Sequence, residues 1–270
     1  MAKTHAGTAS ESHTTTAPGT GFPGVLDTVC AGDVRTEPFP HVVVDNALPA
    51  APYRALADSF PSFRQVGWDG PAPSNKRFAM STFLYDLPDV LPDAWRAFGA
   101  RHTGRAFLRQ VHALFAGHWS PAAEAVWDRL ETASLGLFMR DHEADIQCDA
   151  RAELNTPVTD APSSVRGGHL DIANRLFSGL LYMRPEGDQT PGGDLCLYRP
   201  APEFDPRARK DAFAFADQEL IEAVRVPYAA NRLVFFPNSP AAIHGVTPRP
   251  LTPWQRNYVF ITAEVGQDLF

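Results

Sequence analysis

The chain has 270 residues, of which 44% are hydrophobic, so it can bury a sizeable core in one large domain or two small ones. Twenty-four basic residues against 31 acidic ones give a formal net charge of −7, which argues against nucleic acid or an anionic membrane as the main partner. No apolar run approaches the roughly 18 residues that a membrane-spanning helix needs. The 3 cysteines, widely spaced and without a CxxC motif, argue against a thiolate zinc site and indicate a reducing, cytoplasmic setting.

The N-terminal half is predicted to be rich in helices. Residues 1–20 are dominated by Thr, Ser, Ala and Gly and lack the apolar segment of a signal peptide, so we expect a disordered tail. The β-branched run in "PFPHVVVDNALP" predicts a strand. Helical spacing follows in residues 50–63, 89–116 and 121–139, the last beginning with a proline suited to a first helical turn.

The second half changes to short strands. Residues 145–155, "DIQCDARAELN", alternate with period two, so that Arg151, Glu153 and Asn155 share one face. Further β-rich segments bounded by Gly, Pro or Asn follow at residues 175–185, 192–200, 222–228, 231–239 and 256–265. Many short strands with turn signals favour a sandwich or barrel over a parallel βαβ sheet, so the fold class is mainly β with flanking helices.

His169 and Asp171 stand two residues apart ahead of an apolar run, a spacing that puts both side chains on one face of a strand. His244 follows a later strand and turn, and a curled sheet would bring it to the same point. Two imidazoles and one carboxylate on one side of a metal leave open positions, which is the ligand set of non-haem Fe(II) oxygenases. Arg256, twelve residues after His244, opens the last strand, where a buried guanidinium requires an anion.

Two other interpretations use the same three ligands. A zinc hydrolase would need a general base, usually a glutamate, near the metal, and the chain has no His-Glu-x-x-His motif. A non-catalytic metal-binding β-barrel would have no task for Arg256.

The segments "GGHLD", "SGLLYMRP", "GGDLCLY", "LVFFPNSPAAIHGV" and "RNYVFIT" resemble the core of the 2-oxoglutarate- and Fe(II)-dependent oxygenases, in the prolyl-hydroxylase-like branch. The resemblance covers residues from about 38 to 265, and its specific part is about 145 to 262. It implies a double-stranded β-helix (jelly-roll or cupin-like) core. We therefore expect one domain over residues 21–270, with a helix-rich part at about 38–140 and the β-helix core at about 145–265.

Carried over to this chain, the resemblance implies that His169, Asp171 and His244 bind Fe(II) and that Arg256 binds the remote carboxylate of 2-oxoglutarate. It implies further cosubstrate contacts from Tyr182 and, more weakly, Asn155. Arg249, five residues after His244, is a rival to Arg256. Tyr258 stands where the family often has a serine, so the carboxylate pocket departs from the common pattern.

The implied reaction uses O₂ and converts 2-oxoglutarate to succinate while hydroxylating an unactivated C–H bond of a small polar molecule. Related halogenases have a small residue in place of the metal-binding acid, so Asp171 favours hydroxylation over chlorination. Desaturation, epoxidation and cyclisation stay open, as does the oligomeric state. Residues 73–83, "PSNKRFAMSTF", are a candidate substrate lid. The candidate substrate contacts are Asn75, Arg77, Arg151 and Arg166.

Overall fold

The computed structural model describes residues 21–66, 70–205 and 214–270, so the predicted disordered tail lies outside the described residues. The α-helices are α1 (Ala50–Ala57), α2 (Phe63–Val66), α3 (Asp93–His102), α4 (Arg105–Leu114) and α5 (Pro121–Trp127). Short 3₁₀ turns are η1 (Ala31–Asp33), η2 (Thr82–Asp86) and η4 (Asp217–Glu219). Among the described residues, no helix has the length and apolar character to cross a membrane.

Ten strands form two sheets in the described part of the chain. The strands are β1 (Val42–Asp45), β2 (Arg77–Met80), β3 (Leu135–Leu137), β4 (Ile146–Asn155), β5 (Arg175–Tyr182), β6 (Leu195–Pro200), β7 (Leu220–Val226), β8 (Arg232–Pro237), β9 (His244–Val246) and β10 (Arg256–Val265). The large sheet has the order β1-β8-β5-β10-β4-β2, with β3 beside β4, and the small sheet has the order β7-β6-β9. Every pairing is antiparallel except that of β3 with β4.

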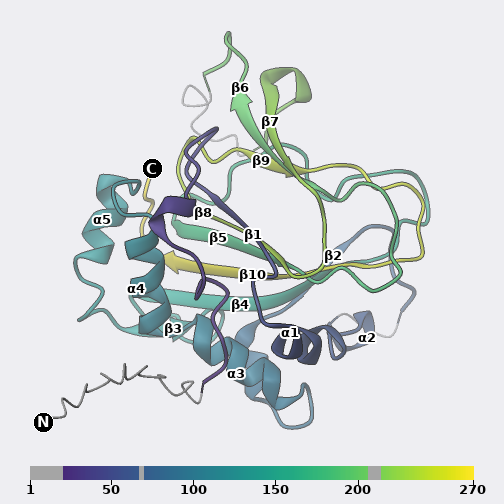
Figure 1. The fold of residues 1–270 in the computed structure, drawn as a ribbon, viewed down its shortest axis with the longest axis horizontal. Coiled ribbons are helices and arrows are strands. Elements are labelled where there is room, and N and C mark those ends of the chain that lie inside the picture. The colour runs from purple at the N-terminus through teal and green to yellow at the C-terminus, as the bar shows by residue number, and fades with distance from the viewer. Residues whose placement is uncertain (1–20, 67–69, 206–213) are drawn as a thin grey trace, which may run out of the picture.

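Alternating side chains give the large sheet two buried faces. On β8 and β10, Phe235 and Ile261 belong to the core shared with the helices, whereas Phe236 and Phe260 belong to a second core shared with the small sheet. This alternation is the period-two rule for strands, applied to a sheet covered on both sides. Figure 1 shows the helices gathered on one side of the large sheet and β6, β7 and β9 on the other. The prediction of a mainly β, double-stranded β-helix core is confirmed.

Two predicted segments differ from the structure. The helix expected over residues 121–139 ends at Trp127, and residues 135–137 form β3 instead. A β-carbon at Gly136 would lie 2.4 Å from the β-carbon of Asp141, so β3 needs glycine to pack against the following turn. Within the candidate lid at residues 73–83, Arg77–Met80 forms strand β2, hydrogen-bonded along β4, so this part is held in the sheet. Strands β1, β2 and β3 therefore bring the helix-rich part into the large sheet.

Candidate metal and cosubstrate site

His169 and His244 are held side by side by backbone pairing. His244 begins β9, and the main-chain N–H groups of His169 and His244 donate to each other's carbonyl oxygens at 2.8 and 3.0 Å. The chains approach so closely here that a β-carbon at Gly245 would lie 2.8 Å from the backbone of Gly167. The sequence predicted a strand at His169, but the residue forms only isolated bridges, and Asp171 lies in the loop before β5.

The two imidazole rings are oriented for metal binding. Nδ1 of His169 lies 2.8 Å from the carbonyl oxygen of Gly167, and Nδ1 of His244 lies 2.9 Å from that of Ala242. Each Nδ1 can therefore donate its proton to the backbone, which leaves each Nε2 with a free lone pair. These Nε2 atoms lie 3.7 and 3.8 Å from the two carboxylate oxygens of Asp171. Burial, followed by the nearby His169, lowers the pKa of His244 to about 4, so its ring is neutral at pH 7.

Asp171 is fixed in its ionised form by partners around it. The Ser178 hydroxyl donates to Oδ2 at 2.6 Å, and Nη1 of Arg175 lies 3.1 Å from Oδ1. Burial alone would raise the pKa of Asp171, but His244, His169 and Arg175 outweigh it and hold the pKa well below its usual range. The three side chains are buried, and their ligand atoms lie within 4.8 Å of one another. Two imidazoles and one carboxylate on one side suit a divalent transition metal and leave room for further ligands.

Arg256 lies at the other end of the same cavity. Its side chain is 2% exposed, and its Nε donates to the carbonyl oxygen of Gly193 at 2.9 Å. The guanidinium lies 5.0–5.1 Å from the ring centres of Tyr182, Tyr228 and Tyr258, which fix its plane. Its Nη2 is buried and has no hydrogen-bond partner in the described part of the chain. A buried donor without a partner is costly, so this atom points to an anionic ligand.

Two further residues leave unmet polar atoms near Arg256. Asn155 lines the cavity at the end of β4, and both polar atoms of its amide are buried without a partner among the described residues. The Tyr182 hydroxyl is buried without a partner as well, although Tyr182 does not line the cavity itself. Burial raises the pKa of Tyr182 to about 12, so the hydroxyl keeps its proton and can donate it. The sequence predicted both residues as cosubstrate contacts, and the structure brings them to this end.

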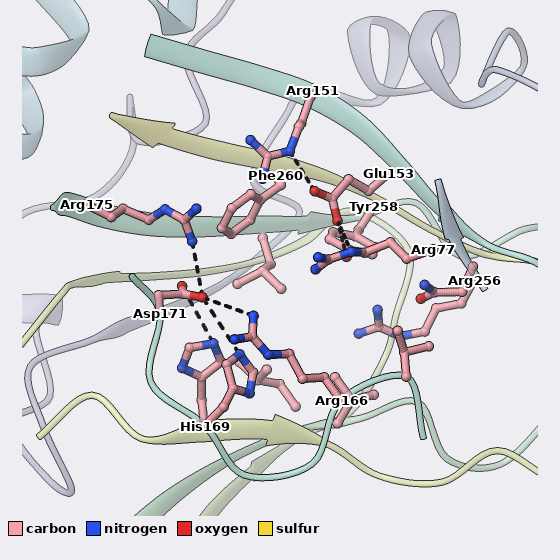
Figure 2. A pocket seen from close by; sticks show the side chains of 16 residues that line it. Arg77, Arg151, Glu153, Arg166, His169, Asp171, Arg175, Arg256, Tyr258 and Phe260 are labelled. Carbon is pink, nitrogen blue, oxygen red and sulfur yellow. Dashed lines mark hydrogen bonds and ion pairs between the residues drawn. The ribbon is translucent and has the colours of Figure 1, made fainter. Parts of the chain in front are cut away.

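Figure 2 shows a charged wall between the two ends of the cavity. Arg151 Nε donates to Oε1 of Glu153 at 2.6 Å, and the Tyr258 hydroxyl donates to Oε2 of the same carboxylate. Burial opposes ionisation of Glu153, but Arg151 and Arg77 outweigh it and lower its pKa. The Phe260 ring lies beneath Arg151 and Arg175, 4.7 and 5.0 Å from their guanidinium carbons. Because Arg151 and Tyr258 donate to Glu153, both of its carboxylate oxygens already accept a hydrogen bond.

The remaining predicted residues divide into two groups. Arg77, Arg151 and Arg166 line the cavity. Asn75 does not, because its Nδ2 donates to the backbone oxygen and hydroxyl of Ser163 at 3.0 and 2.9 Å, beside an adjoining surface groove. Arg249 is buried outside the cavity lining, where its Nη2 donates to the carbonyl oxygen of Trp254 at 2.9 Å. Of the two rival arginines, Arg256 is the one that faces the cavity.

Ser178 and Arg175, which support Asp171 from β5, were not predicted from the sequence. No local pattern marks them, because their partner lies in a loop whose course is set by tertiary packing. Tyr258 was predicted only as a departure from a family pattern. The alternation of β10 places Tyr258 on the same face as Phe260, and this could have indicated that Tyr258 faces the cavity.

Comparisons with known proteins give only distant likenesses. No family model matches the chain, and no curated protein matches it. Among solved structures, a prolyl-4-hydroxylase from Pseudomonas putida is 14% identical over 84% of this chain and 93% of its own, with a TM-score of 0.43. The non-heme alpha ketoglutarate dependent epimerase SnoN from nogalamycin biosynthesis is 12% identical over 83% and 78%, with a TM-score of 0.46. A 2OG-Fe(II) oxygenase family protein from Burkholderia pseudomallei is 12% identical over 84% and 86%, with a TM-score of 0.40. At these values, nothing about the reaction of this chain follows from its neighbours.

Proposed function

We propose that the protein is an Fe(II)- and 2-oxoglutarate-dependent dioxygenase. The observation that carries this proposal is that one cavity holds both the His169–Asp171–His244 cluster and the unsatisfied guanidinium of Arg256. A cosubstrate with a chelating 2-oxoacid at one end and a carboxylate at the other matches this pairing of a metal site with a distant cation. The partners of the protein are a small-molecule substrate and O₂, and we expect the protein to act in the cytoplasm.

Each residue has a defined part in this proposal. His169, Asp171 and His244 would hold the iron through two Nε2 atoms and one carboxylate oxygen. Arg256 would bind the remote carboxylate of 2-oxoglutarate, with the Tyr182 hydroxyl and the Asn155 amide satisfying its remaining hydrogen-bond sites. The bound metal would supply O₂ activation and the oxidation of an unactivated C–H bond, coupled to decarboxylation of 2-oxoglutarate to succinate. The protein positions both molecules and excludes water from them.

Hydroxylation of a small polar molecule, such as an amino acid or a natural-product intermediate, is the outcome that we favour. Asp171 would fill a coordination position that chlorination would need for a halide. Its carboxylate is held by Ser178 and Arg175, which would keep it in place on a bound metal.

The geometry disfavours a zinc hydrolase that uses the same ligands. Glu153 is the one glutamate among the described residues that line the cavity. Its two oxygens accept from Arg151 and Tyr258, and its lowered pKa makes it a poor general base. A metal-binding module without catalysis would leave the polar atoms of Arg256 and Asn155 buried for no purpose.

The test is the visible charge-transfer band that Fe(II) and 2-oxoglutarate produce together when both bind one site. Under anaerobic conditions, the wild-type protein should show a weak band in the green, and admission of O₂ should release succinate. His169→Ala should lose both signals, whereas His118→Ala, at an exposed position remote from the cavity lining, should keep both. Metal binding without the band would refute the oxygenase proposal, and an unaltered His169→Ala variant would refute the ligand assignment.

A further inference from the structure

The cavity contains more arginine than the proposed reaction needs. In the described part of the chain, two acidic residues line it, Glu153 and Asp171. Five arginines line it as well: Arg77, Arg151, Arg166, Arg175 and Arg256. This excess of positive charge occurs in a chain whose formal net charge is −7, so it is a local feature of the cavity.

Three of the five arginines are accounted for. Arg151 is paired with Glu153 at 2.6 Å and has Asp149 behind it at 3.4 Å. Arg175 is paired with Glu264 at 2.7 Å and with Asp171 at 3.1 Å. Arg256 would form an ion pair with the carboxylate of the cosubstrate.

The other two arginines, Arg77 and Arg166, form what we name the mouth pair. Nη1 of Arg166 lies 3.7 Å from Oδ1 of Asp171, and Nε of Arg77 lies 3.7 Å from Oε2 of Glu153. Each acid has closer partners than its arginine of the mouth pair, and Nη2 of Arg166 also donates to the carbonyl oxygen of Leu170 at 3.4 Å. The side chain of Arg166 is 39% exposed and that of Arg77 is 46% exposed, as expected for groups at an entrance.

The mouth pair also lines an adjoining surface groove that contains no acidic residue among those described. The groove is formed by Ser74, Asn75, Lys76, Arg77, Ser163, Ser164, Val165 and Arg166. Figure 2 shows the guanidinium groups of Arg77 and Arg166 reaching into the cavity from different walls, Arg77 beside Glu153 and Arg166 beside Asp171. The two guanidinium groups carry like charges at one entrance and repel each other, and an anionic ligand bound between them would relieve this repulsion.

The balance of charge indicates what that ligand carries. Among the described residues, and with the carboxylates of Asp149 and Glu264 included, five guanidinium groups face four carboxylates in and behind the cavity. The two positive charges of Fe(II) and the two negative charges of 2-oxoglutarate cancel, which leaves one positive charge over. A single carboxylate would neutralise it, whereas a phosphate monoester dianion would exceed it.

We propose that the substrate is a small carboxylic acid whose carboxylate binds between Arg166 and Arg77. This inference rests on the proposed function and adds the substrate class to it. Because Arg166 also borders Asp171, an acid bound by Arg166 would lie next to the metal. The carbon that is oxidised is therefore within a few bonds of the carboxylate.

Binding of carboxylic acids and their primary amides tests this inference without knowledge of the natural substrate. The probes are L-leucine, 4-methylpentanoate and hexanoate, each paired with its primary amide, together with glycerol 3-phosphate. Each is titrated calorimetrically into the anaerobic complex of the enzyme with Fe(II) and 2-oxoglutarate, in which no turnover occurs. At least one acid should bind about tenfold or more tightly than its amide, as expected for a charge-assisted hydrogen bond.

Variants identify the residues responsible for this preference. Arg166→Gln and Arg77→Gln should each reduce the preference for acid over amide about tenfold. Arg166→Lys, which keeps the charge, should recover part of it. Arg109→Gln is the matched control, because Arg109 is a surface arginine outside the cavity lining, paired with Glu131 at 2.5 Å. It should leave the preference unchanged.

The outcomes separate this inference from the proposed function. Absence of the charge-transfer band in the starting complex would refute both. A normal band with no acid preferred over its amide would refute the carboxylate inference alone, as would a preference that survives in both Gln variants. Tighter binding of glycerol 3-phosphate than of every acid would assign the mouth pair to a phosphate and overturn the choice of a carboxylic acid.

Discussion

Replacement of Arg256 by Gln should greatly weaken 2-oxoglutarate binding. The guanidinium is 2% exposed, enclosed by three tyrosine rings, and leaves Nη2 without a partner in the described part of the chain. Truncating one member of a buried, hydrogen-bonded charge pair costs about 2–5 kcal/mol. The apparent affinity for 2-oxoglutarate should therefore fall between about 30-fold and several thousand-fold.

Arg256→Lys should give an intermediate loss, because it keeps the charge but lacks the planar fork that binds a carboxylate through two hydrogen bonds. The assay is succinate release as a function of 2-oxoglutarate concentration at saturating Fe(II), with the charge-transfer band as a direct measure of binding. Fe(II) binding without cosubstrate should be unaffected, since Arg256 is not near the ligand atoms.

Arg249→Gln is the matched control for this experiment. Arg249 is equally buried but does not line the cavity, so its replacement should lower the Tm without a specific effect on the KM for 2-oxoglutarate. The assignment of Arg256 to the carboxylate of 2-oxoglutarate is refuted if Arg249→Gln raises this KM more than Arg256→Gln does. It is also refuted if Arg256→Gln leaves the KM unchanged.

Three further predictions concern other parts of the chain. Ser178→Ala removes the hydroxyl that donates to Asp171 at 2.6 Å. It should weaken Fe(II) binding about 10- to 100-fold in an anaerobic metal titration, and an unaltered affinity would contradict the role of Ser178. Gly193→Ala places a β-carbon 3.2 Å from Cδ of Arg256 at a residue whose φ is +76°. The KM for 2-oxoglutarate should therefore rise and the Tm should fall. A change in Tm alone would show that Arg256 is not displaced. Burial lowers the pKa of His102 from 6.5 to about 3, so the unfolded state binds the extra proton between these values. The free energy of unfolding should therefore fall by about 1.4 kcal/mol per pH unit as the pH drops below 6.5, and denaturant titrations of His102→Gln should show a shallower fall than wild type.

The sequence predicted most of the strands because a sheet covered on both faces leaves a strong local pattern. Residues 145–155 alternate so regularly that both the core face and the cavity face of β4 could be assigned in advance. The helix predicted over residues 121–139 was wrong in its second half, since β3 forms by pairing with β4 and not through its own propensity. Likewise, residues 77–80 form strand β2 because they pair with the edge of β4. This pairing cannot be predicted from local residue types.

The sequence by itself determined which residue types are available for chemistry: a His-x-Asp pair, a later histidine and an arginine that opens the last strand. It also fixed their spacing, which was enough to nominate His169, Asp171, His244 and Arg256 together. Only the tertiary structure decided that these four side chains face one cavity, that Arg256 and not Arg249 faces it, and that Ser178 and Arg175 hold Asp171. The reason is physical: positions along one strand are set by a local period of two, whereas the meeting of β4, β5, β9 and β10 depends on how two sheets pack over a shared core.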